Sequence, residues 1–336
     1  MIKLKQIIPL YIKSPISTFL QEFNKIPLKL VFYHSYLSFM ISLNISENQR
    51  VKLIETKNRI TYTYIKKKFS KELIYDNNQI SSGEKSENII WIFWWQGEDS
   101  APTIVKRCIS SIKENFKLGS VIVIDENNYK SFVHIDHNIL NKFLSGKITI
   151  THFSDYYRMA LLYEHGGLWI DGSIFVNSEL KSDLFEKCIY TIRNPGMDIS
   201  NISNWNWTVG LIGGWRHNSF FMICRNLIIS YWREFDYPID YFFLDHFVKL
   251  IYDNYPKIMQ WFENIEDNNS NFYWLQKNAN KDYNSIDTAE LSSTIFYKIS
   301  WKGNYKLETE EGTKTLFYKW FNNNSINCFE YPQTTG

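Results

Sequence analysis

Apolar residues in the middle of the chain form short continuous runs separated by helix-like stretches, a pattern typical of an α/β protein. Asn88 to Trp95 contains IIWIFWW, an unbroken run of strand length suited to a buried parallel strand. Thr103 to Phe116 carries apolar residues at helical spacing, and Val121 to Ile124 is a second apolar run. Strand, helix and strand in this order predict the first βαβ unit of a Rossmann-like half.

A second helix and strand are predicted further along the chain. Ser154 is a good N-cap, and Tyr156 to His165 contains neither Gly nor Pro, so we expect a helix to begin there. Gly166 and Gly167 supply a left-handed exit from it. The triplet LWI that follows predicts a short buried strand, and Asp171 ends it.

Asp155, Arg158 and Asp171 are the polar groups of this helix and strand. Asp155 and Arg158 are three residues apart and share a helix face. A carboxylate at the carboxyl end of a central strand points into the crevice where α/β proteins bind ligands. The three groups can therefore converge on one polar ligand. The ordinary alternatives are a surface ion pair and an Asp-Gly turn.

The combination of S-D-x-x-R, a G-G pair and a bulky triplet ending in Asp resembles the sugar-nucleotide site of GT-A glycosyltransferases, in particular the bacterial capsular polysaccharide synthesis proteins. The resemblance implies that Asp155 and Arg158 hold the donor sugar. It also implies that Asp171 is catalytic and opens a D-x-D-like motif for a divalent metal and the diphosphate. Gly166 and Gly167 are included among the predicted substrate-binding residues.

The motif departs from D-x-D at its third position, which is Ser173. One carboxylate, a hydroxyl, two phosphate oxygens and water can still satisfy Mg²⁺ or Mn²⁺, which prefer oxygen ligands. We therefore predict a divalent cation held by Asp171 and Ser173, with His246 as a further candidate ligand. The capsular subgroup resembles this chain in having a small residue and then a hydroxyl after its Asp.

The ends of the first two predicted strands carry candidate nucleotide contacts. The sequence W-W-Q-G-E resembles the opening of the capsular family, so Trp95, Gln96 and Gly97 are predicted to meet the nucleotide. Trp94 or Trp95 can stack on a base, although core packing explains either one equally well. Asp125 follows the second strand and is a candidate contact for the nucleoside, with turn capping as its alternative.

Three tryptophans lie in NWNWTVGLIGGWR, which resembles a strand entering a tight loop. Tryptophan faces stack on sugar rings, so Trp205, Trp207 or Trp215 is a candidate for acceptor binding, with core packing as the alternative. Asp245 lies in an aromatic-rich stretch that resembles a later motif of the family, and we predict a catalytic role for it.

The stretch STIFYKISWK resembles the closing element of the family. There Lys298 or Lys302 can reach the diphosphate. We predict a GT-A nucleotide-sugar-binding domain over residues 89–302, an N-terminal helical subdomain over 1–88 and a C-terminal extension over 303–336. Within the N-terminal subdomain, Leu28 to Leu43 is too short to cross a bilayer and is read as a buried helix, with a peripheral membrane contact as the alternative.

Composition narrows the function classes. The 336 residues are 44% hydrophobic, which is enough for a sizeable core, and the net charge of +2 gives no field suited to nucleic acid. The four cysteines are far apart and suggest neither zinc nor disulfides, so we expect a cytoplasmic location. The absence of G-x-G-x-x-G disfavours hydride transfer.

These observations predict a glycosyltransferase that moves a hexose from a nucleotide diphosphate sugar, UDP-linked by preference, to a growing surface glycan on a lipid carrier or oligosaccharide. The resemblance implies retention of configuration and metal assistance. Two alternatives stay open: a catalytically silent carbohydrate-binding protein and a nucleotidyltransferase. The second would normally carry a basic Gly-rich loop after the first strand, whereas acidic Glu98 and Asp99 stand there.

Overall fold

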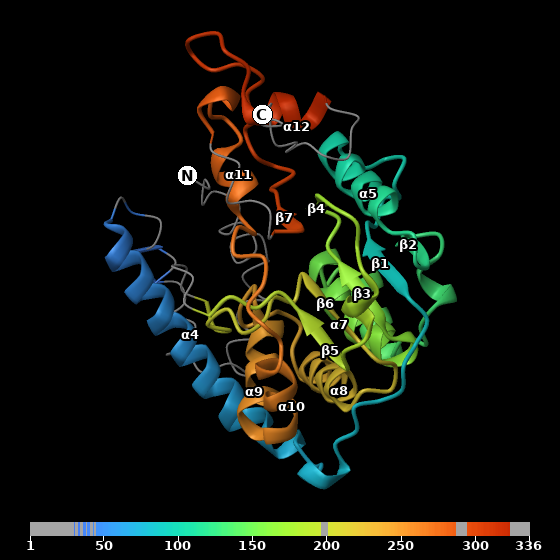
Figure 1. The fold of residues 1–336 in the computed structure, drawn as a ribbon. Coiled ribbons are helices and arrows are strands. Elements are labelled where there is room, and N and C mark those ends of the chain that lie inside the picture. The colour runs from blue at the N-terminus through green and yellow to red at the C-terminus, as the bar shows by residue number, and fades with distance from the viewer. Residues whose placement is uncertain are drawn as a thin grey trace.

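A computed structural model describes residues 30, 33, 36, 37, 39, 40, 43, 45–195, 201–286 and 294–322 (Figure 1). Much of the predicted N-terminal subdomain before residue 45, and the extension after residue 322, lie outside the described residues. Inside the described part, the α/β, Rossmann-like fold class is confirmed, with a helical region ahead of the sheet.

A five-stranded sheet forms the centre of the molecule (Figure 1). Three neighbouring strands run parallel, the fourth, β6, is antiparallel to them, and the edge strand β5 is antiparallel to β6. In spatial order the strands are β2 (Ser120–Ile124), β1 (Ile89–Phe93), β3 (Gly167–Ile170), β6 (Leu211–Gly214) and β5 (Ile189–Thr191).

Alternating residues of β1 pack on the two faces of this sheet, as a pleated strand requires. Ile90 and Ile92 belong to a core shared with α5 (Thr103–Asn115). Trp91 and Phe93 point to the other face and join a larger core. That core includes residues of three helices, α6 (His137–Leu144), α7 (Ile150–His165) and α8 (Ser219–Glu234).

The helix that carries Asp155 begins earlier than predicted. It starts at Ile150, because the side chain of Thr149 accepts a hydrogen bond from the backbone N–H of His152 and caps the end. The predicted cap, Ser154, lies inside the helix, where its hydroxyl donates to the carbonyl of Thr151 at 2.6 Å. The predicted end at Gly166, with φ of 69°, is confirmed.

A two-stranded antiparallel ribbon lies beside the carboxyl end of β3. It joins β4 (Ile174–Val176) to β7 (Phe296–Lys298), with Ile174 opposite Lys298. Phe175 packs edge-on against Trp320 of α12 (Leu316–Asn322). The ribbon therefore connects the segment after Asp171 to the C-terminal part of the described chain.

The long helix α4 (Glu47–Phe69) packs against α9 (Phe243–Asn254) along one side of the molecule (Figure 1). Lys57 of α4 forms an ion pair of 2.7 Å with Asp240, whose side chain is buried. The end of α4 enters the larger core of the α/β body. The remaining helices are α10 (Pro256–Glu263), α11 (Trp274–Asn278) and 3-10 turns at Ser70–Glu72, Asn77–Gln79, Tyr129–Ser131, Ser182–Phe185 and Tyr283–Ser285.

The described part of the chain contains no helix with the length and apolar character needed to span a bilayer. Of the segment predicted as a buried N-terminal helix, Leu30 and Leu37 are helical and buried. Tyr36 and Phe39 are helical and exposed. Cys108, Cys188 and Cys224 are free thiols, and Cys328 lies outside the described residues.

Candidate active site

A pocket of about 470 Å³ opens where β1 and β3 end. Asp171 is the one charged residue among the described residues that line it. Four tryptophans form much of its wall, namely Trp94, Trp95, Trp169 and Trp301. Its polar lining comes from Gln96, Ser100, Thr151, Ser154, Asp171 and Ser173. One carboxylate surrounded by aromatic faces and hydroxyls is a combination that suits a sugar ligand.

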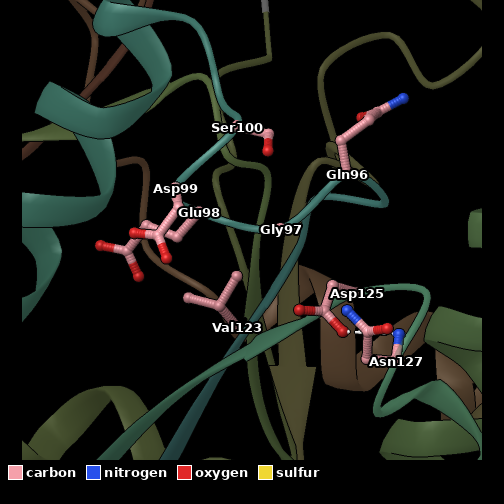
Figure 2. Close-up of a pocket in the computed structure, with 8 residues that line it drawn as sticks. All are labelled: Gln96, Gly97, Glu98, Asp99, Ser100, Val123, Asp125 and Asn127. Carbon is pink, nitrogen blue, oxygen red and sulfur yellow. Dashed lines mark hydrogen bonds between the residues drawn. The ribbon is translucent and has the colours of Figure 1, made fainter.

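A second pocket of about 440 Å³ adjoins the first, because Gln96 and Ser100 line both. Figure 2 shows the loop Gln96 to Ser100 facing Asp125 and Asn127 across this second pocket. Together the two pockets follow the carboxyl ends of β2, β1 and β3, which is the edge where ligands bind in open α/β sheets.

The carboxylate of Asp171 is held by three side chains. The indole N–H of Trp169 donates to Oδ1 at 3.0 Å, and Arg158 Nη2 lies 3.5 Å from the same oxygen. The ammonium of Lys298 donates to Oδ2 at 2.9 Å. Burial alone would raise the pKa of Asp171, but the charges of Lys298 and Arg158 outweigh it and hold the pKa below its ordinary value. Asp171 is therefore ionised at neutral pH.

Arg158 links Asp171 to the predicted partner on α7. Its guanidinium lies 3.2 Å from Asp155 Oδ1 and stacks on the ring of Trp169 at 4.7 Å. Only 5% of the Arg158 side chain is exposed. Asp155 and Arg158 do not line the pocket; they lie behind Asp171. Their predicted convergence with Asp171 is confirmed, while direct contact with a donor sugar stays a prediction.

Asp155 and Asp245 are carboxyls with raised pKa values beside this guanidinium. Burial raises the pKa of Asp155 to about 7, against the lowering effect of Arg158, and the charges of Asp245 and Asp171 raise it further. Burial also raises the pKa of Asp245, on α9, to about 6, partly offset by the hydrogen bond from Trp207 and by Arg158. Perturbed carboxyls gathered behind a pocket are typical of functional sites.

The tryptophans proposed for acceptor binding lie elsewhere than predicted. Trp205 is buried, and Trp207 is buried with its indole N–H donating to Asp245 Oδ1 at 3.0 Å. Trp215 follows β6, whose last residue pairs with Gly167 at the amino end of β3. Its indole N–H donates to the carbonyl of Phe185. Trp205 and Trp207 are thus packed in the core, which is the alternative reading, and Trp215 lies at the end of the sheet away from Asp171. An acceptor contact of Trp215 stays a prediction.

Gly166 and Gly167 also lie at the amino end of β3, away from Asp171. This position does not support their predicted contact with substrate, which stays a prediction. A Cβ on Gly166 would come within 2.7 Å of the backbone nitrogen of Arg216, and one on Gly167 within 2.5 Å of the carbonyl of Ile89. Positive φ and close backbone approach account for both glycines.

The predicted nucleotide contacts do line the pockets. Gln96 is exposed between the two, and Gly97, with φ of 78°, lines the second. Trp95 lines the first pocket and also packs against Phe143 and Tyr129. Asp125 Oδ1 accepts hydrogen bonds from the backbone N–H groups of Asn127 and Asn128, which is the turn-capping alternative. It lines the second pocket as well, and its contact with a nucleoside stays a prediction.

The donor set fits a divalent cation poorly. Both oxygens of Asp171 are engaged by protein donors, and the second motif position offers only the neutral hydroxyl of Ser173. His246 is fully buried in α9. Across the described ranges, no three His, Cys, Asp or Glu residues are grouped so that they could hold a metal ion. The predicted cation stays a prediction, and we derive no chemical step through it.

Trp301 was not singled out by the sequence. It lies three residues after Lys298, lines the first pocket, stands edge-on to Trp94 at 5.6 Å and remains 39% exposed. Its neighbour Lys302 lies over the Trp301 ring, whereas Lys298 contacts Asp171. The structure therefore distinguishes the two lysines that the sequence offered for the diphosphate.

We expect Gly210→Ala to weaken ligand binding without unfolding the protein. The backbone N–H of Asp171 donates to the carbonyl of Gly210, and a Cβ on Gly210 would lie 2.7 Å from Asp171 Oδ2. The added methyl must displace the carboxylate from Lys298, and misplacements of this size cost about tenfold or more in affinity or rate. Thermal shift with and without nucleotide sugar measures both effects. Unchanged affinity in Gly210→Ala would show that the position of this carboxylate is not critical.

Comparison with known proteins places the chain in a family. A sequence model described as "Capsular polysaccharide synthesis protein" matches residues 42–320. Among solved structures, one described as "PaToxG Glycosyltransferase" is similar over 62% of this chain and 84% of its own, with 14% identity and a TM-score of 0.37. No curated protein matches the chain. The family match begins ahead of the predicted boundary at residue 88, and the division into domains stays a prediction. Because the match covers most of the sequence, this chain belongs to the capsular polysaccharide synthesis protein family.

Proposed function

We propose that this protein is a glycosyltransferase that moves a hexose from a UDP-sugar to a growing capsular or other surface glycan. Membership in the family supports a glycosyltransferase, because building a polysaccharide requires enzymes that form glycosidic bonds. We further propose that the acceptor is lipid-linked or an oligosaccharide, reached from the cytoplasm at the inner face of the membrane. The exposed Tyr36 and Phe39, at 48% and 59%, support a peripheral contact there.

The observation that carries this proposal is the pair of adjoining pockets, one of them lined by Asp171, whose carboxylate is paired with Lys298 and Arg158. A nucleotide diphosphate sugar is an elongated ligand with a base, a charged centre and a polyol. The pocket beside Asp125 suits the nucleoside. The aromatic pocket suits the sugar, and the cationic side chains next to Asp171 suit the diphosphate.

The geometry favours displacement on the front face of the sugar. Asp171 is the carboxylate that lines the pocket, and three protein donors already hold it, so it is poorly placed to attack the anomeric carbon. In the proposed step, the bond from the anomeric carbon to the phosphate oxygen breaks as the bond to the acceptor hydroxyl oxygen forms. The acceptor proton passes to the leaving phosphate, and configuration is retained. Cationic side chains stabilise the developing charge on the diphosphate.

Binding and hydrolysis of nucleotide sugars test the proposal. We expect one UDP-sugar, at about 100 times its dissociation constant, to stabilise the fold by about 2.7 kcal/mol in thermal shift. Slow release of UDP without acceptor should accompany binding. Hydrolysis would exclude a silent carbohydrate-binding protein, while binding of free oligosaccharide without any nucleotide would favour it. Binding of a nucleoside triphosphate in preference to every sugar nucleotide would favour a nucleotidyltransferase.

A further inference from the structure

We propose that Lys298 supplies the positive charge at the leaving diphosphate, so that donor binding needs no divalent cation. The inference rests on the proposed function and assigns the chemistry of its charged centre. It starts from the contact between Lys298 Nζ and Asp171 Oδ2, which is 2.9 Å long. Asp171 lines the pocket of about 470 Å³, and Lys298 lies directly beside it.

Lys298 can hold Asp171 and a second anion at the same time. An ammonium carries three N–H donors, of which Asp171 takes one. The Lys298 side chain is 26% exposed and that of Asp171 is 29% exposed, so the pair stands at the surface of the site. The remaining donors can reach an oxygen of a diphosphate bound beside Asp171. Arg158 Nη2, 3.5 Å from Oδ1, adds a second positive charge behind the carboxylate.

The local charge balance also favours a monovalent group. Two carboxylates are neutralised by one divalent cation, whereas one carboxylate is neutralised by one ammonium. Here Asp171 contributes a single negative charge, and Ser173 contributes a neutral hydroxyl. A divalent cation would have to displace Lys298 from Oδ2, and the lysine charge would then lie beside the metal and oppose its binding. The residues present therefore match an ammonium better than a metal ion.

The fold fixes Lys298 at this place. It is the last residue of β7 and pairs with Ile174 of β4, directly after the Asp171 turn. The backbone N–H of Ile299 donates to the carbonyl of Ser173 at 3.0 Å. These contacts lock the register of the ribbon, and register decides which face of a strand each side chain points to. The ammonium is thus preorganised, which is the condition for electrostatic stabilisation of a leaving group.

Calorimetric titration with nucleoside diphosphates tests the inference without an activity assay. The probes are UDP, GDP, ADP and CDP, each in EDTA and in Mn²⁺. We expect the wild-type protein to bind one of them with an affinity that differs by less than about twofold between EDTA and Mn²⁺. Lys298→Met should weaken that binding in EDTA by about tenfold or more, because it removes a charge-assisted partner of the diphosphate.

Two further variants make the result specific. Lys249→Met is the matched control, since Lys249 pairs with Asp253 at 3.0 Å and both side chains are 26% exposed, but Asp253, unlike Asp171, lines neither of the two pockets. It should bind like the wild type. Lys298→Arg keeps the charge and should recover most of the affinity. Lys298→Met should also gain dependence on Mn²⁺, because it frees Asp171 Oδ2 beside the Ser173 hydroxyl.

Each other outcome has a defined meaning. Wild-type binding that is lost in EDTA would overturn the inference while leaving the proposed function intact. Equal binding by Lys298→Met and the wild type in EDTA would overturn it as well. If no nucleoside diphosphate binds under either condition, the proposed function fails and the inference fails with it.

Discussion

Replacing Arg158 with Met is expected to lower the free energy of unfolding by about 3 to 5 kcal/mol near pH 8, the usual cost of breaking a buried ion pair by removing one partner. Arg158 is 5% exposed and lies against Asp155 and Asp171, and it lowers the pKa of Asp245. Met preserves much of the packing on Trp169. The loss of stability therefore measures the missing positive charge rather than a cavity. Urea denaturation monitored by tryptophan fluorescence measures the change.

The same variant should lose less stability at low pH. Burial raises the pKa of Asp155 to about 7 and that of Asp245 to about 6, above the ordinary value of 3.8. In the folded protein these carboxyls hold protons that the unfolded chain has already released. The stability that these two carboxyls add to the folded state is therefore fully present below pH 3.8. It is lost as the pH rises through about 6 for Asp245 and about 7 for Asp155. Near pH 5 both are mostly neutral and need Arg158 less.

Arg233→Met is the control for this prediction. Arg233 lies 3.3 Å from Asp136, a distance similar to that between Arg158 and Asp155, but its side chain is 64% exposed. Exposed ion pairs contribute about 0 to 1 kcal/mol, so this variant should remain close to the wild type at both pH values. A loss in Arg158→Met that is equally small, or that does not depend on pH, would contradict the view that Arg158 compensates buried carboxylates.

Replacing Asp171 with Ala is expected to reduce transfer and donor hydrolysis by about 10² to 10³-fold while leaving the protein folded. The change removes the anion that holds Lys298 and Arg158 in place and the acceptor for the indole N–H of Trp169. Lysine side chains without a fixed partner lose the preorganisation that stabilises a leaving diphosphate. Rates of UDP release with and without acceptor measure the loss.

Asp171→Ala should have little effect on the free energy of unfolding compared with its effect on activity, because the Asp171 side chain is 29% exposed. Asp253→Ala is the matched control, since that carboxylate also holds a lysine and is 26% exposed, but lies outside the pockets. Its activity should stay within about twofold of the wild type. Full activity in Asp171→Ala would show that Asp171 takes no part in catalysis, even though it lines the pocket.

Local sequence patterns predicted much of the framework, because the signals that form it are local. The apolar runs of β1, β2 and β3 and the i,i+3 spacing of Asp155 and Arg158 depend only on neighbouring residues, and each is found as predicted. The end of β3 places Asp171 at the ligand-binding edge for the same reason. The start of α7 was missed because Thr149 and Ser154 are both good caps, and sequence alone does not rank them.

The features of the site that the sequence did not predict depend on contacts between segments that are distant in the chain. Aromatic content does not report which face a side chain occupies, so Trp205, Trp207 and Trp215 were all candidates for acceptor binding, with core packing as the alternative, while Trp301 was overlooked. Lys298 and Lys302 could be separated only once the pairing of β7 with β4 was known. The close approach of Gly210 to Asp171 leaves no mark in the sequence either.

The ribbon of β4 and β7 has a consequence for the order in which the protein is made. Asp171 and Lys298 are 127 residues apart in the chain and meet only when β7 pairs with β4. During synthesis, the sheet from β1 to β6 can form well before Lys298 leaves the ribosome. The nascent chain therefore forms the pocket beside Asp125 early and brings Lys298 to Asp171 late. A shortened product ending before β7 would lack this lysine, so under the proposed function we expect it not to consume donor sugar.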